Sequence, residues 1–281
     1  MKGIKKVMCL LLCLSVAFGI GAFGAGAVPQ TQPVTEVQAK GRTYHWAKYR
    51  GKGTYNCSGS YSQALKQGET GLAKRARTIH AVINGKVNHS KWAYELIRVH
   101  YGWWEYSTET LSSYTYSVRY SRGKTIIDVS PTYVMTPAQE KAVKNKAASI
   151  VKKLKLKGTN YQKVKKINSF LAKNCVYGYQ PRTAYNNLID HVSNCEGYAT
   201  AFYLLCQKAH IPCHVVMGNA YSDGSWGYHA WSLFKSGRDW YTIDTCWNDA
   251  YGGSMYWCKK GFKMKDHIVE SWYAKQLKKL H

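Results

Sequence analysis

Acidic residues are scarce in this sequence: 15 Asp and Glu stand against 40 Lys and Arg in 281 residues, which gives a formal charge of +25. No period recurs along the chain, so solenoid repeats, collagen and coiled coils are excluded. Hydrophobic residues make up 45% of the chain and aromatic residues 14%, which excludes wholesale disorder. What remains is a very basic globular protein that is long enough to bury a core.

Metal-binding motifs are also missing. The sequence has no C-x-x-C pair and no H-E-x-x-H motif, its ten histidines are scattered, and no loop has the ligand spacing of an EF-hand. Structural zinc and calcium are therefore not expected, and no organic cofactor is implied. No recognised nucleic-acid-binding module accompanies the basic charge, so no specific nucleic-acid partner is expected either.

Long apolar runs are absent except at the start of the chain. There three lysines precede an apolar stretch over residues 7–20, and Ala25-Gly26-Ala27 supplies the small residues of a cleavage site. This pattern predicts a secretory signal peptide over residues 1–27, with no stable membrane span after its removal. We expect a secreted protein whose charge favours an anionic cell-wall polymer as a partner, although lysines can also simply keep a secreted protein soluble.

Seven cysteines follow the signal peptide. They are Cys57, Cys175, Cys195, Cys206, Cys213, Cys246 and Cys258. An odd number in an exported protein indicates one free thiol and up to three disulfides, and the sequence does not determine their pairing.

The rest of the chain divides into three stretches. Residues 28–42 form a polar leader, residues 43–135 a smaller aromatic-rich region, and residues 136–281 the expected catalytic domain. In the aromatic-rich region, alternating apolar and polar residues on both sides of a turn at residues 121–124 predict a β-hairpin. Aromatic residues such as Trp103-Trp104 either stack on sugars or fill the core of this region.

Two lysine-rich helices are predicted next. Thr136-Pro137-Ala138-Gln139 is a capping box, and apolar residues then repeat at helical spacing until Gly158 ends the helix. A second helix carries its apolar face from Tyr161 to Leu171. Ten lysines lie between residues 141 and 166, mostly off the apolar stripes, and a solvated helix face explains them more simply than nucleic-acid binding.

A cysteine stands at the start of a third predicted helix. Asn194 precedes Cys195, and Ala199, Phe202 and Cys206 follow on one helical face. Unpaired amide groups and the helix dipole at a helix N-terminus stabilise a thiolate and lower the pKa of its thiol. Cys195 is therefore a candidate nucleophile, whereas Cys206 falls on the apolar stripe.

A histidine and an aspartate come from a predicted hairpin further on. If Ser236-Gly237 is its two-residue turn, His229 lies directly opposite Asp244, with both side chains on the same face of the sheet. An imidazole oriented by a carboxylate can deprotonate a thiol and later protonate a leaving group. A sheet packed against the Cys195 helix would complete a Cys–His–Asp arrangement.

These motifs resemble those of the transglutaminase-like superfamily, and more narrowly of its secreted bacterial members, over about residues 136–270. They are Cys195-Glu196-Gly197-Tyr198-Ala199, Ile211-Pro212-Cys213, His229-Ala230-Trp231 and Trp240-Tyr241-Thr242-Ile243-Asp244. The resemblance implies an α+β, papain-like transglutaminase core, in which the nucleophile helix packs on an antiparallel sheet.

The same resemblance assigns the catalytic roles. It makes Cys195 the nucleophile, His229 the general base and acid, and Asp244 the residue that orients His229. We also predict substrate contacts for Tyr185 and Trp231, although a tyrosine at residue 185 could equally pack a short helix.

Two functions follow from these features. The first is a secreted cysteine-dependent enzyme that transfers the acyl group of protein or peptide amides through a thioester, either to water or to an amine. The second is a non-catalytic cell-wall or glycan-binding protein with a transglutaminase-like domain, which the basic charge and the aromatic N-terminal half favour.

Overall fold

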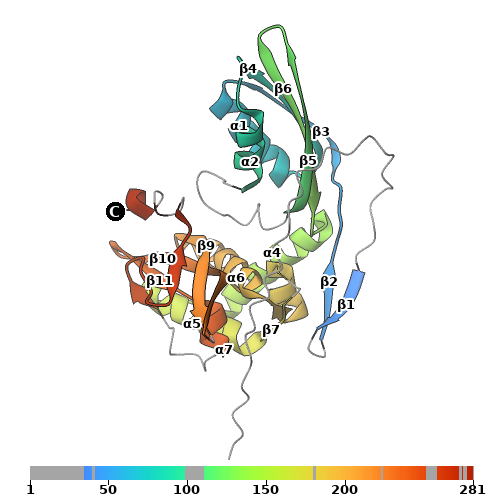
Figure 1. Cartoon of the computed structure of the whole chain (residues 1–281). Helices are drawn as coiled ribbons and strands as arrows, with labels where there is room; N and C mark the ends of the chain where they lie inside the picture. The colour runs from blue at the N-terminus through green and yellow to red at the C-terminus, as the bar shows by residue number, and fades with distance from the viewer. Residues whose placement is uncertain are drawn as a thin grey trace, which may run out of the picture. The chain divides into compact units, whose positions relative to one another are not determined.

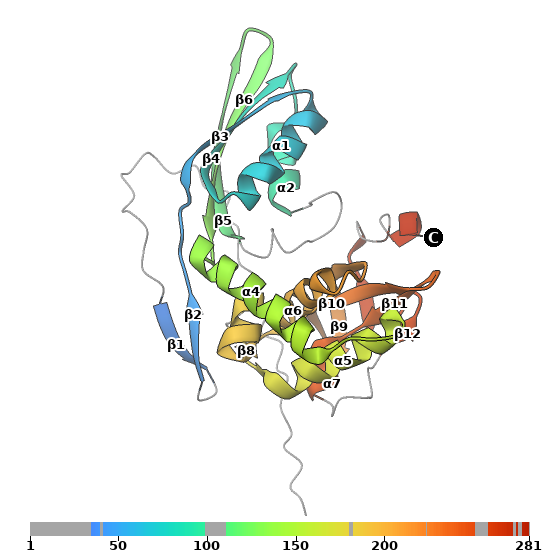
Figure 2. The same ribbon diagram turned by 180° about the vertical axis from the view of Figure 1, so that it is seen from behind.

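The structure is a computed structural model of the chain, drawn in Figure 1 and, from behind, in Figure 2. It describes residues 35–39, 42–98, 111–179, 182–222, 224–250, 258–271, 274 and 277–280. The expected signal peptide, most of the polar leader and Trp103-Trp104 lie outside the described residues. In the part of the chain that is described, no helix is long and apolar enough to cross a membrane.

The chain forms two compact units, and the boundary between them along the chain lies between Ala142 and Val143, within one long helix. Both units contain helices and strands, which confirms the predicted α+β class. The predicted boundary between residues 135 and 136 falls at the start of that helix. Each unit is described below by itself.

The N-terminal unit is built on a four-stranded sheet. Its elements are β1 (Thr35–Ala39), β2 (Arg42–Trp46), β3 (Lys52–Gly59), α1 (Tyr61–Ala73), β4 (Ala76–Asn84), α2 (His89–Arg98), β5 (Leu111–Ser121) and β6 (Lys124–Tyr133). The strand order is β3-β4-β6-β5, and only β3 and β4 run parallel. Helices α1 and α2 cover one face of this sheet, as Figures 1 and 2 show from opposite sides.

The predicted hairpin is confirmed as β5 and β6. Their turn consists of Arg122 and Gly123, both with positive φ angles of 48° and 71°. Two positive φ angles in a two-residue loop match the right-handed twist of the strands, and glycine adopts them without strain. The alternating residues Tyr114 and Val118 pack against the core of this unit, as the period of two predicts.

The C-terminal unit is built on a five-stranded antiparallel sheet. Its elements are α4 (Pro137–Leu154, shared with the N-terminal unit), α5 (Asn160–Asn174), β7 (Val176–Tyr177), η1 (Asn186–Asp190), β8 (Val192–Ser193), α6 (Cys195–Lys208), β9 (Cys213–Ser222), β10 (Ser225–Ser236), β11 (Asp239–Ile243), α7 (Thr245–Ala250), β12 (Lys259–Lys260), β13 (His267–Val269) and η2 (Lys278–Leu280). The strand order is β12-β11-β10-β9-β13. Helix α6 packs on β9 and β10.

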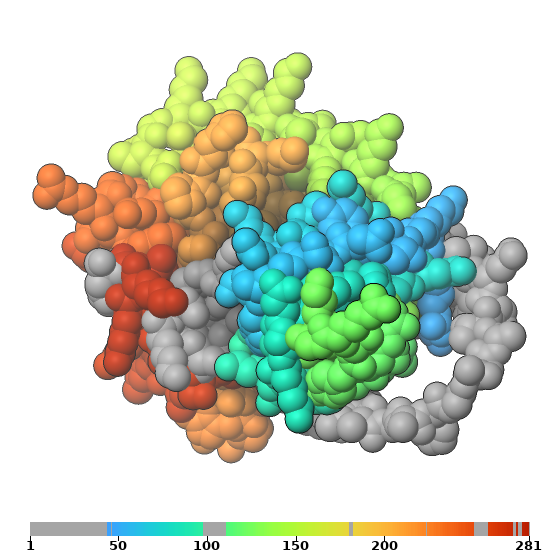
Figure 3. Space-filling view, turned by 90° about the horizontal axis from the view of Figure 1, so that it is seen from above, coloured from blue at the N-terminus to red at the C-terminus, as the bar shows by residue number. Residues whose placement is uncertain are grey.

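Both lysine-rich helices are confirmed. The Thr136 hydroxyl accepts a hydrogen bond from the backbone N–H of Gln139 while the Gln139 side chain accepts one from the Thr136 N–H, which is the predicted capping box. Helix α4 ends at Leu154 rather than at Gly158, because Lys155 already takes a positive φ of 45°. Figure 3 shows the yellow-green side chains of α4 and α5 projecting from the surface.

The hairpin of β10 and β11 forms with a register that differs from the predicted one. Its two-residue turn is Gly237-Arg238, so Ser236 pairs with Asp239 and Ser232 with Ile243. Only Gly237 has a positive φ, of 62°, and a turn with glycine at its first central position has this shape. The strand pairing therefore shifts by two residues, which leaves every side chain on its predicted face.

Candidate functional site

Cys195 is the first residue of α6 and is 5% exposed. The preceding residue, Asn194, is in extended conformation and its side-chain oxygen accepts a hydrogen bond from the Gly197 N–H at 3.2 Å. Asparagine is among the preferred residues for this capping position. The helix therefore begins at Cys195, and the positive end of its dipole acts on the thiol as the sequence predicts.

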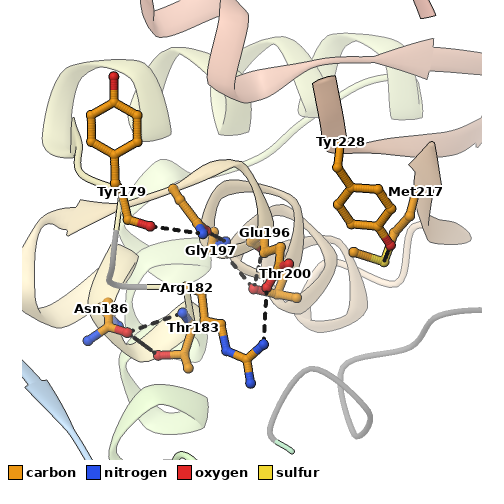
Figure 4. Close-up of polar contacts among 10 residues, drawn as sticks. Tyr179, Arg182, Thr183, Asn186, Glu196, Gly197, Thr200, Met217 and Tyr228 are labelled. Atoms are coloured by element: carbon orange, nitrogen blue, oxygen red, sulfur yellow. Dashed lines mark hydrogen bonds and ion pairs between the residues drawn. The ribbon is translucent and has the colours of Figure 1, made fainter. Parts of the chain in front are cut away.

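The start of α6 is fixed by contacts with the segment before it (Figure 4). The Asn194 amide donates a hydrogen bond to the Tyr179 carbonyl at 3.4 Å, and Arg182 forms an ion pair with Glu196 at 3.7 Å. A side chain on Gly197 would collide with Ser193 and approach the Thr183 carbonyl within 3.0 Å. The glycine after Cys195-Glu196 therefore lets the chain pack closely against the first turn of the helix.

His229 and Asp244 form a buried pair. The His229 Nε2 lies 2.7 Å from Asp244 Oδ2, and the two side chains are 4% and 0% exposed. His229 comes from the first half of β10, and Asp244 directly follows β11. The last pair of the observed register is Ser232 with Ile243, so the residue opposite Asp244 is Trp231 rather than His229. The predicted pair therefore forms across a diagonal, within the reach of both side chains.

The Asp244 carboxylate is held on both oxygens. Its Oδ1 accepts hydrogen bonds from the backbone N–H groups of Cys246 at 2.9 Å and Trp247 at 3.0 Å, at the start of α7. Burial alone would raise the pKa of this carboxyl, but the charge and hydrogen bond of His229, with a further hydrogen bond from His267, lower it below its usual value. Asp244 is therefore ionised, so the His229 Nε2 carries the proton that it donates.

This arrangement leaves the His229 Nδ1 as the nitrogen that can exchange a proton with a substrate or a thiol. The ring is held in place by Trp247, whose centroid lies 5.2 Å away, and by Trp231 at 6.2 Å. Since α6 packs on β10, the helix that carries Cys195 lies against the strand that carries His229. The site can thus supply a base of fixed tautomer and orientation.

His267 is a third member of the site that the sequence motifs did not predict. Its Nε2 lies 3.1 Å from Asp244 Oδ2, the same oxygen that accepts from His229, and its side chain is 1% exposed. His267 begins β13, a strand of three residues that pairs with β9 at the edge of the sheet. A strand so short has too few residues for a clear alternation, so no periodic signal could have revealed it.

His229, Asp244 and His267 also offer ligand atoms within 4.8 Å of one another, as a metal site would require. The Nε2 atoms of both histidines already donate to the carboxylate, however, and in the described part of the chain the buried Nδ1 of His267 has no hydrogen-bond partner. A histidine that binds a metal almost always has its other nitrogen supported by a carboxylate, carbonyl or water. The cluster thus fits a hydrogen-bonded carboxylate better than a metal centre.

The two predicted substrate residues differ in their surroundings. Tyr185 directly precedes η1 and is half-buried, and burial raises the pKa of its hydroxyl. Trp231 is 2% exposed and packs edge-on against His267 with ring centroids 4.8 Å apart. Substrate contact stays a prediction for both residues.

The seven cysteines are all thiols rather than disulfides, so the prediction of up to three disulfides is wrong for this structure. Six of them are buried, which suits a small apolar side chain in a core. Burial raises the pKa of the Cys175 thiol to about 11 and that of Cys57 to about 11. These two thiols are therefore protonated at neutral pH, which makes them useful references for Cys195.

Comparisons with known proteins agree with the motifs. The family model described as Transglutaminase-like superfamily matches residues 148–245, a span that contains Cys195, His229 and Asp244. The resemblance predicted from the sequence is thereby confirmed. No curated protein sequence matches the chain.

Three solved structures that match part of the chain have low sequence identity to it. "Crystal structure of a TGase" is 14% identical with a TM-score of 0.35 and covers 71% of this chain, which spans 55% of that protein. A putative cysteine protease from Cytophaga hutchinsonii is 12% identical with a TM-score of 0.34, covering 57% and 83% of the two chains. The periplasmic domain of TgpA from Pseudomonas aeruginosa, bound to ethylmercury, is 14% identical with a TM-score of 0.31, covering 48% and 65%.

Proposed function

Since residues 148–245 belong to the transglutaminase-like superfamily, we propose that this protein is a cysteine-dependent enzyme that transfers acyl groups from protein or peptide amides. The observation that carries the proposal is the buried His229–Asp244 pair at 2.7 Å. A histidine whose Nε2 is held by an ionised carboxylate presents Nδ1 as a base of fixed orientation. Cys195, at the capped start of the helix on the same sheet, is the proposed nucleophile.

The first half of the reaction forms a thioester. His229 accepts the thiol proton of Cys195 at Nδ1, and the thiolate sulfur attacks the carbonyl carbon of the amide. Backbone N–H groups at the start of α6 stabilise the oxyanion of the tetrahedral intermediate. The C–N bond then breaks, and His229 returns the proton to the departing amine. The Asp244 carboxylate stabilises the imidazolium between these two transfers.

The second half of the reaction depends on the acceptor. Water, deprotonated by His229, attacks the thioester and releases a carboxylic acid together with the regenerated thiol, which makes the enzyme a peptidase or amidase. A primary amine, such as that of a lysine, instead forms a new amide and cross-links two chains. Both routes use the same three residues, so the acceptor determines which activity results.

Intact-mass spectrometry distinguishes these routes. An unfolded carrier protein is incubated with the protein and a primary-amine probe, and the Cys195→Ala variant serves as the blank. Additions of probe mass indicate amine transfer, fragments indicate a peptidase, and the small mass gain of deamidation indicates a glutamine amidase. Any of these three products, absent from the blank, supports the proposal.

A matched control uses the second cysteine of the same helix. Cys206 is 0% exposed and lies on the buried face of α6, so Cys206→Ala removes a thiol without touching the helix N-terminus. We expect this variant to retain product formation while Cys195→Ala loses it. Equal activity of the wild-type and Cys195→Ala proteins would contradict the proposal, as would the absence of every product from both.

We also propose that the lysine-rich surface of α4 and α5 attracts an anionic cell-wall polymer. Between Glu140 and Asp190 the chain has no acidic residue, and the lysines of both helices are mostly exposed. A surface of one sign raises the local concentration of an oppositely charged polymer through long-range attraction. Export, for which the segment 1–27 is the support, would bring the protein to such a polymer.

This attraction is tested by co-sedimentation with insoluble poly(glycerol phosphate). We expect binding that weakens steeply between 0.05 and 0.5 M salt, because the Debye length falls from above ~10 Å to below ~8 Å over this range. Replacing Lys144, Lys152, Lys153 and Lys165 by glutamine should weaken it further. Binding that is unaffected by salt and by these substitutions would contradict an electrostatic partner and would favour a non-catalytic glycan-binding protein instead.

A further inference from the structure

His267 reaches the carboxylate from the far edge of the sheet. Strand β13 pairs with β9, with Val269 opposite Gly218, and Gly218 is also the partner of His229 in β10. A side chain at residue 218 would collide with the Ile268 carbonyl and with the ring of Trp231. The glycine therefore lets β13 approach closely enough for His267 to share the oxygen that His229 uses.

Four donors surround the Asp244 carboxylate. Oδ2 accepts from His229 at 2.7 Å and from His267 at 3.1 Å, while Oδ1 accepts from two backbone N–H groups at the start of α7. An ionised carboxylate has about four lone-pair sites, so this one is fully occupied. Both imidazoles must therefore donate from Nε2.

The tautomer of His267 follows from its other nitrogen. The His267 Nδ1 is buried and has no hydrogen-bond partner among the residues that the structure describes. A proton there would leave a buried donor unsatisfied, which is more costly for a charged group than for a neutral one. The neutral ring with its proton on Nε2 fits these surroundings. The neutral His267 ring thus donates a hydrogen bond to the Asp244 carboxylate, which also accepts one from His229.

The ring of His267 is fixed by two tryptophans. Trp247 packs edge-on with its centroid 4.6 Å away, and Trp231 packs edge-on at 4.8 Å. Trp247 also contacts His229. Contact with two large buried rings restricts the orientation of the imidazole, so packing helps to direct its N–H toward the carboxylate. This is the arrangement expected of a residue that positions another group.

We propose that His267 is a positioning residue, which holds the Asp244 carboxylate in place and shares its negative charge with His229. This inference rests on the proposed function. A neutral donor on Oδ2 reduces the charge that the carboxylate offers to a His229 imidazolium. The imidazolium is therefore less stabilised than in a site without His267, and it returns its proton to the leaving amine more readily.

The groups that act on the pair come from four elements. His229 lies on β10 and His267 on β13, and they are the two titratable groups whose effects on Asp244 are resolved. From α7, Cys246 and Trp247 contribute backbone amides. From α6, Cys195 would contribute the thiolate of the proposed ion pair. A change at His267 must therefore be measured through the titration of Cys195 and His229.

The test compares His267→Leu with His267→Gln. Leucine removes the donor and keeps much of the volume, whereas glutamine keeps an N–H group that can reach the carboxylate. The rate at which iodoacetamide alkylates Cys195 is measured from pH 3 to 9, and kcat and KM are measured on the carrier protein. His214→Leu is the control, because His214 stacks on Trp240 of the same sheet outside the cluster.

Removing the donor leaves more carboxylate charge for the His229 imidazolium, which in turn favours the Cys195 thiolate. We therefore expect the midpoint of the alkylation profile to move to lower pH in His267→Leu. We expect kcat to fall by about 10²-fold, the scale of a misplaced catalytic group, with KM unchanged. His267→Gln should restore the wild-type midpoint and most of kcat, and His214→Leu should change neither.

Alkylation separates this inference from the proposed function. If Cys195 of the wild-type protein reacts at pH 5 no faster than a thiol in unfolded protein, the proposed function fails. If Cys195 is reactive but the two variants share one midpoint and one kcat, His267 only packs the site and the inference is wrong. If His267→Leu loses the fold, judged by thermal unfolding, it is replaced by His267→Met, which also lacks an N–H donor. The midpoint of that variant must then lie below the midpoint of His267→Gln, and equal midpoints would contradict the inference.

Discussion

A histidine and an aspartate pair across strands in both units of this protein, His80 with Asp128 and His229 with Asp244, and the two pairs differ in burial. In the N-terminal unit, His80 Nδ1 lies 2.6 Å from Asp128 Oδ1, and the side chains are 26% and 34% exposed. In the C-terminal unit, His229 and Asp244 lie 2.7 Å apart and are 4% and 0% exposed. The same two groups at the same separation are thus found in two different dielectric surroundings.

The surroundings determine what each pair can do. Water reaches the partly exposed pair of the N-terminal unit and screens it, so the pair adds little to stability. The His229–Asp244 pair is screened much less because both side chains are buried. Its interactions are therefore stronger, and the loss of one partner leaves the other uncompensated. A short distance is therefore enough to identify a histidine–aspartate pair. Burial and additional hydrogen-bond donors distinguish the pair that can serve as a functional site.

Matched substitutions of the two aspartates give the largest expected effects. Asp244→Asn should lower turnover by about 10⁴-fold, because an amide does not hold the histidine in its catalytic tautomer. It should also lower the free energy of unfolding by about 3–5 kcal/mol, as for other broken buried pairs. Asp128→Asn should cost less than about 1 kcal/mol and leave turnover unchanged. Urea unfolding and the mass assay measure both quantities, and similar effects of the two substitutions would remove the distinction.

The pH dependence of stability sharpens the comparison. The folded-state pKa of Asp244 is lowered by its histidine partners, despite burial, relative to about 3.9 in an unfolded chain. A lowered pKa contributes stability that is fully present above the unfolded value and is lost as pH falls toward the folded one. Urea unfolding from pH 7 to 2 should therefore show a constant difference between wild-type protein and Asp244→Asn down to about pH 4, and a shrinking difference below it. A difference that grows on acidification would contradict the ionised state of Asp244.

Local signals predicted much of the C-terminal unit. The start of α6 could be placed because Asn194 caps it, and capping involves only neighbouring residues. The shared face of His229 and Asp244 could be placed because side chains alternate along any strand. Their register could not, since Gly237 fits either position of a two-residue turn by composition, and the backbone conformation decides between them.

Non-local pairing explains what the sequence did not reveal. His267 joins the site through a three-residue strand whose partner, β9, lies far away in the sequence. In the N-terminal unit, β3 and β4 pair in parallel although α1 separates them in the sequence. Such contacts depend on how elements pack rather than on any residue's own preference. The His229–Asp244 pair and the helix start at Cys195 were thus predictable, whereas the second imidazole was not.

The smallest expected effects concern the two hairpin turns, where the units should behave alike. Gly123 and Gly237 have φ angles of 71° and 62°, and a Cβ on either would meet no atom within 4 Å. Alanine at each position should therefore cost about 1 kcal/mol through backbone conformation alone, measured by urea unfolding. Turnover should persist in both variants, because neither turn touches the His229–Asp244 pair.

Equal losses of unfolding free energy in Gly123→Ala and Gly237→Ala would show that the two turns do not account for the difference between the units. Each hairpin has its own two-residue loop, and the two loops differ in sequence. The alanine variants therefore measure backbone strain and not the effect of a buried charge. If Gly237→Ala instead abolished turnover while Gly123→Ala did not, the register of β10 and β11 would have slipped, since the conformation of the turn at Gly237 helps to set that register. A slip of one residue would carry His229 to the opposite face of the sheet from its present partners. A loss of turnover in Gly237→Ala alone would thus mean that activity depends on strand register. Similar turnover in the two glycine variants would mean that it depends on the buried carboxylate and its two imidazoles.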